Sequence, residues 1–215
     1  MATLLEGRVI AVAGGAGNLG PTVVRRLADA GAVLSAAGRD SRPLEALRGD
    51  IGDMVEPAVV DLLDPEATRD WAAGLAERHG RIDGLVHLVG GWRGGTPIED
   101  APLEDWGFLS GLLVRTVQHA TQAFARHLLE SGRGRFVLVS AGQAQAPTHP
   151  NAAYAAAKAA SETWTLALAD RFRGTGATAN IVVVGAIVTP AMRAESPADT
   201  AASMNGQRVT LRGAA

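Results

Sequence analysis

Short apolar runs alternate with longer amphipathic stretches along the 215 residues of the chain. This alternation is typical of βαβ units that wind a parallel sheet with helices on both of its faces. We therefore expect an α/β fold, a Rossmann-type doubly wound parallel sheet of about seven strands. The expected strands cover residues 8–14, 32–38, 57–63, 83–90, 135–141, 178–185 and 207–213.

Several residues mark the expected helix ends. Pro21 suits a first helical turn, and Gly31 can end the same helix. The stretch "DPEATRDW" (64–71) opens another helix with acidic residues, which the helix dipole favours there. Because no linker, repeat or low-complexity tract interrupts the pattern, residues 1–215 are expected to form a single domain.

Composition narrows the function classes. Hydrophobic residues make up 47% and charged residues 20% of the chain, as in ordinary soluble proteins. The net charge of -2 offers no basic field for nucleic acid. The first apolar run is too short for a signal peptide or a membrane span. The absence of cysteine excludes disulfides and zinc-thiolate sites and fits a cytoplasmic location.

A glycine-rich turn, "AGGAGNLG" (13–20), follows the first expected strand and precedes the first helix. In this context Gly14, Gly17 and Gly20 can provide a tight turn, close backbone approach to a pyrophosphate, and tight packing of helix on strand. The helix N-terminus, with Asn18 and Leu19 just before it, would bind the anion. The alternative is a purely structural turn.

Residues that follow the next strands indicate which dinucleotide would bind. Arg39 ends the second expected strand, where an acidic residue would bind a ribose 2′-hydroxyl and a basic one a 2′-phosphate. NADP(H) is therefore favoured over NAD(H), although a solvated surface arginine is the alternative. Asp61 could accept a hydrogen bond from the adenine amino group or cap a helix. Leu62 and Gly90 lie beside it at the same expected sheet edge.

The only tyrosine and the only lysine of the chain stand four residues apart, as Tyr154 and Lys158. On a helix the two side chains share a face. A nearby ammonium stabilises a phenolate, so we expect Lys158 to lower the pKa of Tyr154 and to bind the cofactor ribose. A phenol tuned in this way can transfer a proton. An exposed pair on an alanine-rich helix is the alternative.

Across nearly its whole length the chain resembles the short-chain dehydrogenase/reductase family. The match rests on "YAAAK" (154–158), supported by the glycine turn, by Asp61 and by "IVTPAMR" (187–193). The resemblance implies a single NAD(P)-binding Rossmann domain with Tyr154 and Lys158 as catalytic residues. It also implies that Thr189 contacts the nicotinamide end of the cofactor.

The match departs from the family pattern at two catalytic positions. The family serine would fall on Ala141, and Ser140, one place earlier, either takes its role or is a strand-end hydroxyl. The family asparagine on the long fourth helix is replaced by Leu113. These departures are similar to the dihydropteridine reductase branch, in which Trp92 would stack on a planar heterocycle or else cover the core.

The leading hypothesis is an NAD(P)(H)-dependent oxidoreductase that transfers a hydride to or from a small carbonyl or imine compound. The alternative is a cofactor-binding sensor or scaffold with a degenerate site. The family resemblance implies a homodimer or homotetramer formed through residues 109–129 and 159–172. The substrate region after Thr189 is short, which predicts an open site. No metal site is expected, and His87 is expected to be a hydrogen-bonded structural histidine.

Overall fold

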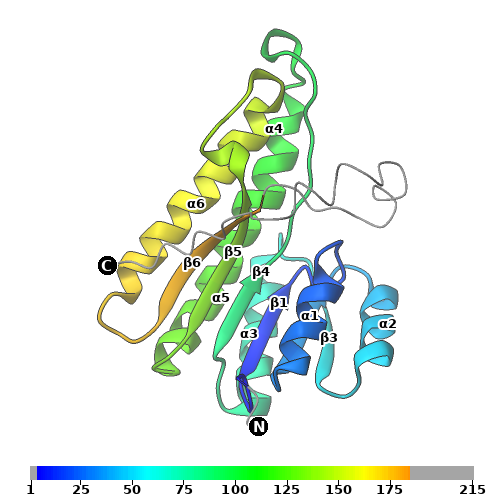
Figure 1. Cartoon of the computed structure of the whole chain (residues 1–215), viewed down its shortest axis with the longest axis vertical. Helices are drawn as coiled ribbons and strands as arrows, with labels where there is room; N and C mark the ends of the chain where they lie inside the picture. The colour runs from blue at the N-terminus through cyan, green and yellow to red at the C-terminus, as the bar shows by residue number, and fades with distance from the viewer. Residues whose placement is uncertain (1–3, 185–215) are drawn as a thin grey trace.

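The computed structural model describes residues 4–184, which form one parallel sheet flanked by helices (Figure 1). The sheet order is β3-β2-β1-β4-β5-β6, and every neighbouring pair is parallel. This confirms the predicted doubly wound α/β fold. The strands are β1 (Val9–Ala13), β2 (Val33–Gly38), β3 (Val55–Val59), β4 (Gly84–His87), β5 (Arg135–Ala141) and β6 (Thr178–Val184).

Helices cover both faces of the sheet with separate apolar clusters. Side chains of α3, α5 and α6 pack on one face, around Trp71 and Phe124. Side chains of α1 and α2 pack on the other face, around Val24 and Leu44. The helices are α1 (Gly20–Asp29), α2 (Ser41–Ile51), α3 (Pro65–His79), α4 (Glu104–Leu109), α5 (Thr116–Glu130) and α6 (Ala152–Phe172).

An arm formed by α4 and the start of α6 rises beyond the carboxyl ends of the strands (Figure 1). A π-helical segment, η2 (Ser110–Arg115), joins α4 to α5. Short 3-10 turns, η1 (Ile98–Asp100), η3 (Gly142–Ala144) and η4 (His149–Asn151), lie in the connecting loops. The arm therefore forms one wall above the edge where an open α/β sheet binds ligands.

The observed strands differ from the expected ones in number, at both ends of β3 and at the end of β4. Six strands lie within residues 4–184, and the seventh expected strand, 207–213, falls outside the described residues. β3 runs two residues earlier than the expected start and ends at Val59, since the Asp61 carboxylate accepts from the Leu63 amide and turns the chain. β4 ends at His87, before the glycine-rich loop.

The predicted helix boundaries are confirmed. Pro21 lies in the first turn of α1, and Gly31, just past its end, has a φ of 89°. Asp64 caps α3, where its carboxylate accepts from the amides of Glu66 and Ala67. No helix among residues 4–184 is long and apolar enough to cross a membrane.

Asp83 joins the amino ends of β1, β4 and β5. Its carboxylate accepts from the Val9 amide at 3.2 Å and from the Ser131 hydroxyl at 2.7 Å, and it forms ion pairs with Arg8, Arg81 and Arg133. Burial alone would raise the pKa of Asp83, but these hydrogen bonds and the Arg81 charge lower it below 3.8. The ionised carboxyl therefore stabilises the fold.

Replacement of Asp83 by Asn should lower the free energy of unfolding by roughly 3 kcal/mol at pH 7, because it leaves partly buried guanidinium groups without their anion. Chemical denaturation measures this loss. Since a lowered folded pKa contributes stability that is fully present above pH 3.8, the difference from wild type should shrink as pH falls below 3.8 and through the folded pKa.

The matched control is Asp170→Asn, whose carboxylate pairs with Arg173 and is 72% exposed. Its cost should stay below about 1 kcal/mol. Equal losses in the two variants would contradict the role given to Asp83.

Candidate active site

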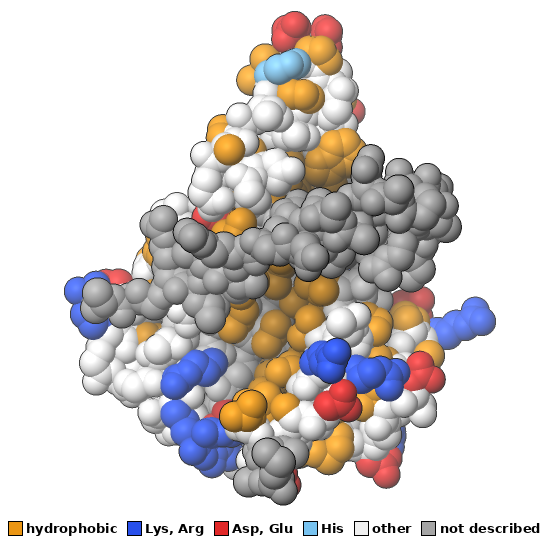
Figure 2. All heavy atoms as spheres, in the orientation of Figure 1, with side chains coloured by type: hydrophobic (Ala, Val, Ile, Leu, Met, Phe, Trp, Pro, Cys, Tyr) orange, Lys and Arg blue, Asp and Glu red, His pale blue; other side chains and the backbone are white. Residues whose placement is uncertain are grey.

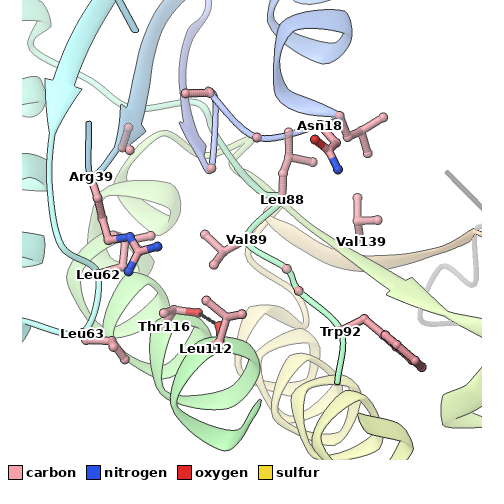
Figure 3. A pocket seen from close by; sticks show the side chains of 18 of the residues that line it. Asn18, Arg39, Leu62, Leu63, Leu88, Val89, Trp92, Leu112, Thr116 and Val139 are labelled. Atoms are coloured by element: carbon pink, nitrogen blue, oxygen red, sulfur yellow. Dashed lines mark hydrogen bonds between the residues drawn. The ribbon is translucent and has the colours of Figure 1, made fainter. Parts of the chain in front are cut away.

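A cavity of about 590 Å³ lies at the carboxyl ends of the strands. It spans the boundary between β1 and β4, where the strand order reverses, and loops from both halves of the sheet line it (Figure 3). On the face shown in Figure 2, hydrophobic side chains gather near the centre, with basic side chains around them. A pocket at a strand-order reversal is the usual ligand site of open α/β sheets.

The cavity brings together most of the residues predicted from the sequence. Its lining includes Gly14, Gly17, Asn18, Leu19, Arg39, Asp61, Leu62, Gly90, Ser140, Tyr154 and Lys158. Gly20 lies just behind the turn, at the first position of α1. Thr189 and the rest of 187–193 fall outside the described residues.

The glycine turn is held too tightly for side chains at three positions, Gly14, Gly15 and Gly20, and a Cβ at Gly15 would lie 2.9 Å from the Ala36 Cβ. Gly14 has a φ of 81°, and a Cβ there would lie 3.0 Å from the Val89 nitrogen. A Cβ at Gly20 would overlap the carbonyl group of Gly15. Gly17 is less confined, since a Cβ there would lie 3.3 Å from the nearest atom, the Gly14 carbonyl oxygen. The turn therefore presents bare backbone to the cavity.

Gly20→Ala should lower the melting temperature by several degrees, because the added methyl overlaps the backbone of the turn and α1 must move. Thermal unfolding followed by circular dichroism measures the shift. The control is Gly49→Ala in α2, where an added Cβ meets nothing within 4 Å, so helix propensity alone should raise stability slightly. A Gly20→Ala protein as stable as wild type would contradict the packing role.

Arg39 and Asp61 lie at the end of the cavity that β2 and β3 form. Arg39 is exposed and has no hydrogen-bond or ion-pair partner within residues 4–184, and Figure 3 shows its guanidinium pointing into the opening. The Asp61 carboxylate accepts from the Leu63 amide at 3.0 Å, and Leu62 is buried. Asp64, not Asp61, caps α3.

Tyr154 and Lys158 lie one turn apart on α6 and both line the cavity. Lys158 is 6% exposed, and its Nζ donates to the Val139 carbonyl at 3.0 Å. Burial lowers the pKa of Lys158 to about 8. Burial also raises the pKa of Tyr154, so the expected lowering of its pKa by Lys158 is not seen in this structure. The phenol is therefore protonated at neutral pH.

Ser140, near the end of β5, donates its hydroxyl proton to the Glu162 carboxylate at 2.5 Å. The other Glu162 oxygen accepts from the Gln145 side-chain amide, also at 2.5 Å. A hydroxyl has one proton to donate, so Ser140 could donate to a ligand only by releasing Glu162. Sequence reasoning missed Glu162, although its position four residues after Lys158 places it on the same face of α6.

Leu113 is 2% exposed and packs with Leu109 and Ala157 in a cluster that Tyr154 also contacts. It belongs to the π-helical segment, a feature that frequently occurs at functional sites. The Leu113 carbonyl accepts from the Ser161 hydroxyl at 3.0 Å, which links this segment to α6. The position at which the family pattern has an asparagine is thus occupied here by an apolar, packed side chain.

Two aromatic residues near the cavity behave differently from each other. Trp92 lines the cavity, is 58% exposed and donates its indole N–H to Asn151 at 3.3 Å, so it does not cover the core. His87 is fully buried, and neither ring nitrogen has a hydrogen-bond partner among the described residues. The expected hydrogen-bonded histidine is therefore wrong in that detail.

The surroundings of His87 keep its imidazole neutral. Burial and then the Lys158 charge lower the pKa of His87 to about 3, and the Thr116 backbone opposes this weakly without reaching hydrogen-bond geometry. No group of three or more metal-ligating side chains occurs within residues 4–184. The ionisable side chains that line the cavity are Arg39, Asp40, Asp61, Tyr154 and Lys158.

A comparison with protein families matches residues 8–200 to the short chain dehydrogenase family. The chain belongs to this family. It is 30% identical over 168 residues to gluconate 5-dehydrogenase of Gluconobacter oxydans. The aligned region covers 77% of this chain but only 65% of the length of that relative. The narrower resemblance to the dihydropteridine reductase branch is not confirmed.

Solved structures of the same fold contain nicotinamide cofactors. A metagenomic short-chain oxidoreductase in complex with NADP is 26% identical, with a TM-score of 0.75 over 85% of this chain and 84% of that one. A 3-ketoacyl-(acyl-carrier-protein) reductase from Brucella melitensis complexed with NADH is 25% identical, with a TM-score of 0.78 over 87% and 79%. These neighbours support a nicotinamide cofactor without choosing between its two forms.

Proposed function

We propose that the chain is an NADP(H)-dependent oxidoreductase that transfers a hydride to or from a carbonyl or imine carbon of a small molecule. The observation that carries this proposal is the cavity itself. Arg39 and Asp61 lie at one end, the Tyr154–Lys158 pair of α6 lies at the other, and the bare glycine turn lies between them. A dinucleotide that spans these ends would place its nicotinamide beside a proton donor.

The residues of the cavity fit the parts of such a cofactor. The turn before α1 offers backbone N–H groups and a helix N-terminus to the pyrophosphate. Arg39 would bind a 2′-phosphate, Asp61 the adenine, and Lys158 the nicotinamide ribose. Leu62 and Gly90 would line the adenine and ribose portions, and Thr189 would contact the nicotinamide.

Tyr154 would exchange a proton with the substrate oxygen or nitrogen. Because burial raises the pKa of Tyr154, the phenol holds its proton at neutral pH and can donate it during reduction. The Lys158 ammonium would stabilise the phenolate left behind. When bound, the nicotinamide would supply or accept the hydride. Ser140 would hold the substrate oxygen in exchange for its bond to Glu162.

Tyr154→Phe should lower turnover by about 10²-fold or more, because the variant has no proton to transfer. Turnover is measured with saturating NADPH on a panel of carbonyl, quinone and dihydropteridine substrates. Fluorescence titration with NADPH should show nearly unchanged binding, which serves as the control for folding.

Two results separate the enzyme from a cofactor-binding sensor or scaffold. Wild-type binding of NADPH without turnover of any compound on the panel would favour the sensor. Equal turnover by wild type and Tyr154→Phe would contradict the assigned proton donor.

Arg39→Ala should weaken NADPH binding roughly tenfold or more and leave NADH binding nearly unchanged, because only NADPH carries the 2′-phosphate. Parallel fluorescence titrations measure both affinities. The control is Arg25→Ala, an exposed arginine of α1 outside the cavity lining. A parallel loss for both cofactors, or no loss for NADPH, would contradict the assigned preference.

We also propose a cytoplasmic homodimer or homotetramer formed through α5 and α6, within residues 109–129 and 159–172. Leu166 of α6 is 60% exposed, as expected for a side chain that a second subunit would cover. The absence of a basic surface field argues against nucleic acid as a partner.

A further inference from the structure

The positively charged ammonium of Lys158 belongs to a side chain that is almost completely buried. Its ammonium has one hydrogen-bond acceptor among the described residues, the Val139 carbonyl at 3.0 Å. An ammonium has three protons to donate, and burying a charge is costly unless further acceptors or an opposite charge compensate it. The Val139 carbonyl accepts only one of these three protons, so an opposite charge nearby would help to stabilise the ammonium.

A carboxylate lies one helical turn further along the same helix face. Glu162 is half-buried, and its two oxygens accept from the Ser140 hydroxyl and the Gln145 amide, each at 2.5 Å. Two donors fix the position of this carboxyl group. No direct ion pair joins Glu162 to Lys158 within the described part of the chain, so their attraction acts through space.

The other groups that face Lys158 are neutral at neutral pH. Tyr154, on its own helix, is held protonated by burial. His87, from β4, is held neutral with a pKa of about 3. β5 contributes the Val139 carbonyl and the Ser140 hydroxyl, which carry no charge. Glu162 is thus the anion that acts on Lys158 within residues 4–184.

We propose that Glu162 is a positioning residue of this site: its carboxylate, anchored by Ser140 and Gln145, keeps Lys158 protonated beside Val139. Burial already lowers the pKa of Lys158 to about 8, and the Glu162 charge opposes a further fall. Without that charge the ammonium loses its proton closer to neutral pH. The consequence for turnover rests on the proposed function, whereas the charge of Lys158 does not.

The single lysine of the chain permits a direct test. Protein labelled with ¹³C at lysine Cε gives one lysine resonance, assigned by its loss in Lys158→Arg. Its chemical shift is followed against pH in wild type and in Glu162→Gln. The midpoint should lie near 8 in wild type and about one pH unit lower in the variant, because removal of a nearby anion disfavours the ammonium.

The control is Glu66→Gln in α3, which removes a carboxylate whose side chain is 83% exposed and should leave the midpoint unchanged. If Glu162→Gln does not fold, Glu162→Asp keeps the charge but draws it back from Ser140 and Gln145. Its midpoint should also fall below that of wild type. A wild-type midpoint in the folded Glu162 variant would overturn the inference.

Turnover against pH then separates this inference from the proposed function. In a working enzyme, activity that needs the Lys158 ammonium should fall on the alkaline side, and the fall should begin at lower pH in Glu162→Gln. A shifted lysine midpoint in a protein with no turnover would contradict the proposed function alone. An unshifted midpoint in an active enzyme would contradict the role of Glu162 alone.

Discussion

The reversal of strand order between β1 and β4 is the constraint on which the site depends. The chain leaves these two neighbouring strands toward opposite faces of the sheet, so their carboxyl ends open a gap instead of being closed by one crossover. Gly14 must then pass close to Val89, and α1 must begin close to Gly15. The glycines are needed because the two halves of the sheet meet there, and bare backbone faces the cavity as a consequence.

The second feature on which the site depends is the positive charge of Lys158, at the other end of the same gap. Lys158 reaches the Val139 carbonyl from α6, where a compact ammonium fits and a planar guanidinium fork would need more acceptors. This accounts physically for a single lysine in a chain whose other long basic side chains are all arginine. The same position also explains why the pKa of Lys158 is lowered, because the ammonium at the edge of the cavity is largely buried away from water.

The fold and most of the cavity could be predicted from sequence because both depend on local patterns. Apolar periodicity located all six described strands, and Tyr154 with Lys158 followed from helical spacing. The ends of β3 and β4 were missed because they depend on a side-chain turn at Asp61 and on the loop after His87. Glu162 and the π-helical segment were missed because each is defined by contacts with distant residues, Ser140 and Ser161.

The departures from the family pattern are linked by geometry. Successive side chains of a strand point to opposite sides, so a hydroxyl at Ser140 instead of Ala141 turns toward α6, where Glu162 accepts its proton. The apolar Leu113 leaves the cluster against which Tyr154 packs without a polar side chain at that position. A polar contact next to the site instead joins α6 to β5, through the Ser140–Glu162 hydrogen bond. In the proposed enzyme, such a site would act on its substrate through Tyr154, with the charge of Lys158 one helical turn away.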